Sequence, residues 1–177
     1  MGNILGPPQI VALVILAQRG LEEAYSRRNT ARLLAEGGRE VGADFYPIVI
    51  VTHLAWLGAI FFLIPANGPI VWPLVVVYLV LLVFRYWIIA TLGQYWTHRI
   101  ITVDGAPVVT GGPYAFIRHP NYAEVIAECF VLPLVFGSWT VALVMTPIVV
   151  AVLGYKGMLE DRAIATRRAQ TRAASGA

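Results

Sequence analysis

The feature that most restricts the fold of this chain is a series of long apolar segments with very few charges. Residues 45–64 and residues 70–92 are each long enough, at about 20 predominantly apolar residues, to cross a bilayer as a helix. Only 13% of the residues are charged, whereas about 25% is typical of soluble domains, and mean hydropathy is +0.71. The sequence therefore predicts an all-α integral membrane protein.

Three more apolar segments complete a prediction of five transmembrane helices in a single domain, residues 1–177. The apolar part of the first, from Ile10 to Ala17, is too short to cross a bilayer unaided, and a re-entrant or interfacial helix is the alternative. The predicted parts are a long N-terminal helix in 1–36, spans two to four in 45–136, and a fifth span with an amphipathic C-terminal helix in 139–172.

The segment Ile100–Val109 alternates around Asp104-Gly105, a dipeptide that favours a two-residue hairpin turn. We therefore expect a small β-hairpin at the membrane surface between spans three and four.

The basic residues predict the orientation. Every Lys and Arg except Arg85 lies in one of three segments that five spans would place on the same side. The positive-inside rule makes that side cytosolic, with the N-terminus outside and the C-terminus inside. Because the basic residues do not cluster on a soluble face, the net charge of +3 does not indicate nucleic-acid binding. The single cysteine, Cys129, excludes a disulfide framework and a Cys-based zinc site.

The loop of residues 111–122 contains more glycine, proline, basic and aromatic residues than a simple connection between helices needs. Gly111-Gly112-Pro113 exposes backbone amides, and Arg118 and His119 come just before a helix that we expect to begin at Pro120. A helix N-terminus with a basic neighbour favours anion binding. The alternative is a basic interfacial loop followed by an ordinary proline-initiated helix.

The run Arg118-His119-Pro120-Asn121-Tyr122 resembles the Arg-His-Pro-x-Tyr motif of the isoprenylcysteine carboxyl methyltransferase family, which are integral membrane enzymes that use S-adenosylmethionine. The second signature of that family is a Glu-Glu pair after the next helical hairpin. Here Glu160-Asp161 stands at that place, so the second acid is one methylene shorter. The likeness extends from about Tyr95 to Ile164.

The chain is most similar to a small bacterial branch of this family that accompanies type III polyketide synthases. The N-terminal third shares Arg28-Asn29, and Tyr46-Pro47 followed by His53, with that branch. This resemblance implies O-methylation of an alkylresorcinol or alkylpyrone and a location in a bacterial plasma membrane.

The resemblance also implies which residues contact the cofactor. These are Arg118, His119, Tyr122 and Glu160, and more loosely Pro113 and Tyr114. Glu160 would bind the amino group of S-adenosylmethionine, the loop would bind its carboxylate, and the C-terminal helix would close over it. Asp161 is expected to be a solvated or helix-capping charge, and His98 an interfacial residue. No metal site is expected.

Three ionisable residues fall at a similar depth on three different spans: His53, Arg85 and Glu128, each about 10–12 Å from the cytosolic end. Intramembrane ionisable residues usually mark a functional site. We expect His53 or Glu128 to act as a general base and Arg85 to stabilise an oxyanion, with a structural Arg85–Glu128 ion pair as the alternative.

The remaining candidates on the acceptor side are Tyr46, Asn121 and Glu124, and Arg118 belongs with the catalytic set because turnover should depend on it.

These observations favour an integral membrane, S-adenosylmethionine-dependent methyltransferase. The cofactor would come from the cytosol, and a lipophilic acceptor would come from the bilayer lipids. O-methylation of a polyketide-type phenol or hydroxypyrone is the first expectation. The alternatives are carboxyl methylation of a prenylcysteine-like acceptor, N-methylation of a lipid amine, and a non-enzymatic small membrane protein. The sequence does not specify the oligomeric state.

Overall fold

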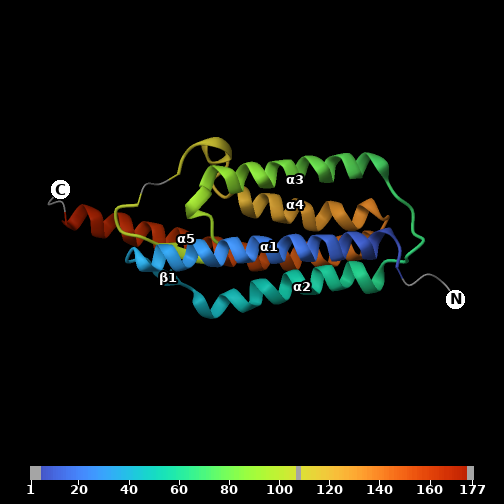
Figure 1. Cartoon of the computed structure of the whole chain (residues 1–177), viewed down its shortest axis with the longest axis horizontal. Helices are drawn as coiled ribbons and strands as arrows, with labels where there is room; N and C mark the ends of the chain where they lie inside the picture. Colours follow the sequence, from blue (N-terminus) through green and yellow to red (C-terminus); the bar gives the residue numbers. More distant parts are fainter. Residues whose placement is uncertain (1–4, 107–108, 175–177) are drawn as a thin grey trace.

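The computed structural model describes residues 5–106 and 109–174, with side chains described through residue 165. This part of the chain is a bundle of helices with a small two-stranded sheet (Figure 1). The α-helices are α1 (Pro7–Ala35), α2 (Tyr46–Leu63), α3 (Trp72–Leu92), α4 (Pro120–Val135) and α5 (Trp139–Ala174). The short elements are β1 (Arg39–Val41), β2 (Ile100–Thr102) and the 3-10 helices η1 (Ala43–Phe45), η2 (Gly93–Tyr95) and η3 (Gly112–Ala115).

The five helices lie side by side along the long axis of the molecule (Figure 1). Helix α4 packs against α3 and α5, and α2 packs against α1 and α5. The tight connections 64–71 and 136–138 lie at the end where the described chain begins. The sheet, the 3-10 turn η3 and the last turns of α5 lie at the opposite end (Figure 1). We call this opposite end the loop end of the bundle.

The bundle has large apolar side chains both inside and outside. Trp56 and Ile60 of α2, Leu132 of α4 and Val149 of α5 form part of one buried core. Many other apolar side chains on α2, α3 and α5 are exposed, including Phe62 at 81%. A surface this apolar is not stable in water and is typical of contact with lipid. The prediction of a helical integral membrane protein is thus confirmed.

Three segments are long and apolar enough to cross a membrane: Ala43–Leu63, Trp72–Tyr95 and Trp139–Ala165. Helix α4 is shorter, at 16 residues, and has two buried glutamates. The second half of α1 is polar, and its first half is mostly apolar and only partly exposed, since Ala12 and Ile15 are buried. The described residues therefore support three candidate spans, and the count of five stays a prediction.

The expected fifth span and C-terminal helix form one continuous helix, α5. The sequence analysis separated them at Lys156 because polar residues begin there. No proline follows Pro147, and the residues after Lys156 are mostly good helix formers, so the backbone continues without a break. The residues that follow the span are therefore held in a fixed orientation relative to it.

The expected hairpin of Ile100–Val109 is wrong. Asp104 and Gly105 do form a turn, closed by a 3.3 Å hydrogen bond from Ala106 N to Val103 O. However, β2 pairs with β1 in antiparallel register, with Val41 opposite Ile100. Residues 109 and 110 are not strand, and residues 107 and 108 lie outside the described part. The pairing partner comes from the segment after α1, which local alternation could not reveal.

Helix α1 is attached to its neighbours at both ends. Near its start, Gln9 Nε2 donates to the carbonyls of Phe61 and Ile64, each at 2.9 Å, where α2 ends. Near its end, Asn29 Nδ2 donates to the carbonyls of Gly93 (3.2 Å) and Trp96 (2.8 Å). Unpaired helix-end carbonyls need such partners. The polar half of α1 thus positions the chain that leads from α3 into the loop end.

Candidate active site at the loop end of the bundle

The loop 111–122 is anchored on the end of α3 by a glycine. Gly112 has φ +56, and a Cβ there would lie 2.6 Å from Thr91 Oγ1. A larger residue would therefore be strained and would also collide with α3. Pro113 is buried in the following turn, and Ile117 N donates to its carbonyl at 3.0 Å. This packing fixes the position at which α4 begins.

The motif residues meet the first polar turns of α5 directly. Tyr122 Oη donates to Glu160 Oε2 at 2.6 Å, and the His119 ring stacks on the Tyr122 ring with centroids 5.4 Å apart. His119 Nε2 lies 3.2 Å from Asp161 Oδ1, and Arg118 Nη2 lies 2.9 Å from the same oxygen. The two predicted motifs, 42 residues apart in the case of His119 and Asp161, therefore form one cluster.

This cluster lines a cavity of about 340 Å³ that opens to the surface, within the range of about 300–1,000 Å³ usual for small-molecule sites. We call it the cofactor cavity, because the sequence analysis expects its motif residues to contact a cofactor. Its other walls come from the end of α1, the residues after α3 and the β2 segment. Burial raises the pKa of the Tyr114 phenol, so Tyr114 presents a neutral hydroxyl. Asn121 Oδ1 is buried without a hydrogen-bond partner among the described residues.

The residues expected to bind the cofactor are mostly brought together. Those that line the cavity are Tyr114, Arg118, His119, Tyr122 and Glu160. Pro113 does not line it and lies buried in the turn that holds the loop against α3.

Two expectations at this cavity need correction. Asn121 was expected on the acceptor side, but it lines the cofactor cavity. Asp161 was expected to be a solvated or capping charge, but it lies within α5 and pairs with both Arg118 and His119. Sequence spacing could not indicate these contacts, because they depend on how α5 is rotated against α4.

A second polar cluster is buried farther inside the bundle. Arg85 of α3 donates to Glu22 through Nε (2.8 Å) and Nη2 (2.5 Å), and to Glu124 of α4 through Nη1 (2.8 Å). Its Nη1 lies 3.9 Å from Glu128, which also bonds to Arg19. We call these five residues the buried ion cluster. The sequence analysis placed Arg85 and Glu128, together with His53, at one depth, and it missed that α1 contributes Arg19 and Glu22.

His53 is not hydrogen-bonded to the buried ion cluster. Its ring bonds to the backbone of Val49 on the same helix and lies edge-on to Trp56, with centroids 6.2 Å apart. Arg85 bonds two carboxylates, so these side chains form an ion network, and whether the network also takes part in the reaction stays a prediction. That network involves Glu22 and Glu124 more closely than Glu128.

Tyr46 and His98 share a carboxylate. Tyr46 Oη donates to Glu23 Oε2 at 2.5 Å, and His98 Nδ1 lies 2.9 Å from the same oxygen. The hydrogen bond from His98 is the main interaction that lowers the pKa of Glu23, to about 2, so this carboxylate is ionised at neutral pH. Burial lowers the pKa of His98. Because an ionised carboxylate only accepts hydrogen bonds, His98 Nδ1 carries the proton.

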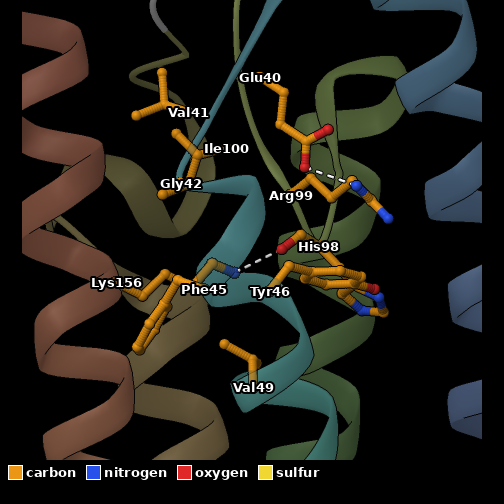
Figure 2. Close-up of a pocket in the computed structure, with 10 residues that line it drawn as sticks. All are labelled: Glu40, Val41, Gly42, Phe45, Tyr46, Val49, His98, Arg99, Ile100 and Lys156. Carbon is orange, nitrogen blue, oxygen red and sulfur yellow. Dashed lines mark hydrogen bonds and ion pairs between the residues drawn. The ribbon is translucent and has the colours of Figure 1, made fainter.

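A small pocket lies beside Tyr46 and His98, between the start of α2 and α5 (Figure 2). Its volume of about 10 Å³ has room for about one water-sized group. Lys156 of α5, Arg99 and Ile100 line both this pocket and the cofactor cavity. Lys156 received no role in the sequence analysis. The available signal was a lone lysine where a long apolar helix turns polar.

Comparison with known proteins agrees with this geometry. A sequence model of the Isoprenylcysteine carboxyl methyltransferase (ICMT) family matches residues 74–166, which include the loop 111–122 and Glu160. A relative, the uncharacterized protein YpbQ of Bacillus subtilis (strain 168), is 30% identical over 159 residues, which are 88% of this chain and 95% of the relative. No solved structure matches the chain significantly.

The match covers both motifs and more than half of the chain. Since the relative is uncharacterized, it gives no support to the polyketide-associated branch. The chain belongs to the isoprenylcysteine carboxyl methyltransferase family of membrane methyltransferases.

Proposed function

We propose that this protein transfers a methyl group from S-adenosylmethionine, bound in the cofactor cavity, to a lipophilic acceptor that arrives from the bilayer. The observation that carries the proposal is the convergence of the Arg118–Tyr122 motif and Glu160 on one open cavity. Family membership supports methyl transfer, and the exposed apolar helices support an acceptor dissolved in lipid.

The residues of the cavity fit the chemical groups of this cofactor. Glu160 can accept hydrogen bonds from an ammonium group, and Arg118 and His119 can donate to a carboxylate. The unpartnered Asn121 Oδ1 can accept a hydrogen bond from an amino group or a hydroxyl. These are the groups that an amino-acid zwitterion and an adenosine present.

The cofactor would supply a methyl group on a positively charged sulfur. The task of the protein is then alignment, because methyl transfer is an in-line displacement. Tyr122 holds the Glu160 carboxylate in place, and the His119 ring supports Tyr122. The turn at Gly112 and Pro113 fixes the loop against α3. These contacts exist without a ligand, so little reorganisation would be needed on binding.

Of the acceptors considered, carboxyl methylation fits the family by its description. A polyketide-type phenol or hydroxypyrone depends on short likenesses at residues 28–29, 46–47 and 53, outside the matched region. A lipid amine has no observation in its favour. We place the loop end on the cytosolic side, where S-adenosylmethionine is available, because the Lys and Arg residues gather there.

His53 and Glu128 stay candidates for removing a proton from a phenol or enol acceptor. Arg85 is better suited to positioning Glu22 and Glu124, since stabilising an oxyanion would require it to leave them. If either candidate is the base, His53→Ala or Glu128→Gln should bind cofactor normally yet lose methyl transfer. Wild-type turnover in both variants would assign the layer a structural role.

Isothermal titration of the detergent-purified protein with S-adenosylhomocysteine tests the proposal. We expect Arg118→Ala and Glu160→Gln to weaken binding by about tenfold or more, because each removes a charge-assisted hydrogen bond. Arg39→Ala is the matched control, since Arg39 is exposed and does not line the cavity. No binding to folded wild-type protein would favour a non-enzymatic membrane protein instead.

A further inference from the structure

Lys156 is a buried lysine on the wall of the cofactor cavity. The residue is 8% exposed, and its Nζ donates to the His98 carbonyl at 2.7 Å (Figure 2). Nζ also lies 5.2 Å from the centre of the Tyr122 ring. No carboxylate among the described residues forms an ion pair with it. Burying an unpaired ammonium is costly, so this position is suited to an anion that the chain does not provide.

Lys156 lies between two cavities, so an anion bound to it would be in contact with both. Lys156, Arg99 and Ile100 form the wall that the small pocket and the cofactor cavity share. Arg99 already bonds Glu40 at 2.7 Å, and its guanidinium lies over the Tyr46 ring (Figure 2). Among the described residues of that wall, Lys156 is thus the cation without a carboxylate.

The carboxylate of Glu160 in the cofactor cavity already has other contacts. Glu160, one helical turn farther along α5, accepts a hydrogen bond from Tyr122 at 2.6 Å and lies 3.7 Å from His119. The carboxylate of a bound cofactor would have Arg118 and His119, which also line the cavity. The second substrate therefore remains as the source of an anion for Lys156.

The surroundings of the small pocket suit an apolar molecule with a polar head. Phe45, the last residue of η1 before α2, contacts Tyr155 of α5, with ring centroids 4.7 Å apart. Both helices expose apolar side chains to the lipid nearby, including Ile48. The pocket itself is large enough for one water-sized group, which matches an oxygen atom and excludes an alkyl chain. The alkyl chain of an acceptor would lie outside the pocket, along the line where α2 and α5 meet.

We propose that Lys156 binds the acceptor, and that its ammonium holds an anionic oxygen, either a carboxylate or a phenolate, on the wall between the small pocket and the cofactor cavity. This inference rests on the proposed function and narrows it to O-methylation. A lipid amine would be a poor acceptor, because its reactive nitrogen would face a positive charge.

The reaction balances with an acceptor of this kind. The anionic oxygen gives a lone pair to the methyl carbon, forming the new O–C bond. The S–C bond breaks, and its electron pair stays on sulfur, leaving S-adenosylhomocysteine. A carboxylate needs no proton transfer, whereas a phenol first loses its proton to a base. The methylated oxygen is neutral and no longer pairs with Lys156, which favours release of the product.

Lys156→Met and Lys156→Arg test the proposal. The probes are N-acetyl-S-farnesylcysteine, its methyl ester, a 5-alkylresorcinol and phosphatidylethanolamine. In wild-type protein we expect the free acid to bind about tenfold or more tighter than its ester. Lys156→Met should remove that preference and raise KM for the anionic acceptor, and Lys156→Arg should restore part of both. Lys156 also lines the cofactor cavity, but the proposal assigns its ammonium to the acceptor. The affinity for S-adenosylhomocysteine should therefore fall by much less than in Glu160→Gln, to within about threefold of wild type.

The outcomes separate this inference from the proposed function. If wild-type protein fails to bind S-adenosylhomocysteine, the proposed function fails. If it binds S-adenosylhomocysteine but does not prefer the acid to the ester, or methylates phosphatidylethanolamine, only the role of Lys156 is overturned. The same holds if Lys156→Met weakens S-adenosylhomocysteine binding as strongly as Glu160→Gln, because Lys156 would then hold the cofactor carboxylate. Methylation of N-acetyl-S-farnesylcysteine would show that the anionic oxygen is a carboxylate, and methylation of the 5-alkylresorcinol would show that it is a phenolate.

Discussion

Two asparagines show how similar side chains serve different purposes in this protein. Asn29 is buried and bonds the carbonyls of Gly93 and Trp96, so it holds the backbone after α3. Asn121 lines the cofactor cavity, and its buried Oδ1 has no partner among the described residues. A polar atom left unpaired in the free protein costs stability and is available for a ligand.

This difference gives a prediction. Asn121→Ala should lower the affinity for S-adenosylhomocysteine by about fivefold or more while leaving the melting temperature unchanged or higher. Asn29→Ala is the matched control and should lower the melting temperature, because two backbone carbonyls lose their donor. Titration calorimetry and thermal unfolding in the same detergent measure both effects. Normal cofactor affinity in folded Asn121→Ala would remove Asn121 from the site.

At the scale of elements, the buried ion cluster connects α1, α3 and α4. Arg85 bonds Glu22 of α1 and Glu124 of α4, and the pairs are almost fully buried. Arg19, which pairs with Glu22 and Glu128, completes the cluster. The cluster therefore contains three carboxyl groups and two guanidinium groups. The direct contacts between α1 and α3 are few, so these ion pairs are a main connection between those helices.

Arg85→Leu should therefore destabilise the protein by about 3–5 kcal/mol, since it leaves buried carboxylates without a partner. Arg27→Leu breaks an exposed pair with Glu23 on one helix and should leave the stability nearly unchanged, because water screens that pair. Denaturant unfolding in mixed micelles, followed by circular dichroism, compares the two. Equal stability of the two variants would mean that the cluster contributes little to the packing of the helices.

The continuity of α5 makes a separate prediction about that element. The same helix contains core residues such as Val149 and the cavity residues Lys156, Glu160 and Ile164. Truncation after Gly154 should abolish S-adenosylhomocysteine binding but leave a chain that resists carbonate extraction from membranes. Truncation after Ala165 removes none of the cavity-lining residues whose side chains the structure describes, and it should keep binding. Loss of binding in the second variant would mean that residues beyond 165 contribute to the site.

At the scale of the whole molecule, the apolar exterior and the separation of its two ends determine how it lies in a membrane. The exposed side chains of α2, of α3 and of α5 up to Met158 are largely apolar. The sheet and the segments that contain the two motifs lie at the loop end (Figure 1), and residues of these segments line the cofactor cavity. A bilayer would therefore cover the middle of the bundle and leave the cavity close to one interface.

Cysteine labelling tests the orientation. Asn67→Cys, in the turn between α2 and α3, should react with an impermeant maleimide added outside the cells. Asp104→Cys, at the loop end, should react only after the membrane is permeabilised. The native Cys129 is buried and should stay unlabelled in both variants. The opposite labelling pattern would place the cofactor cavity outside the cytosol.

The sequence alone determined the class of the protein and the position of its main motifs. Apolar length fixes helices in a membrane because backbone groups in lipid must be hydrogen-bonded within the segment, and this does not depend on the other segments. The run Arg118–Tyr122 and the acid at Glu160 were recognisable because they are contiguous or follow a known spacing. The similar depth of Arg85 and Glu128 along their helices also followed from the helical rise.

Only the tertiary structure decided which side chains meet. The pairing of β2 with β1, the contribution of Arg19 and Glu22 to the buried ion cluster, and the pairing of Asp161 with Arg118 all join segments far apart in the chain. These contacts depend on the rotation of each helix about its own axis, which packing against neighbours sets. The position of Lys156 between two cavities has the same origin. Its sequence neighbourhood specifies a helix, and the neighbouring α2, α4 and β2 segment give that lysine its surroundings.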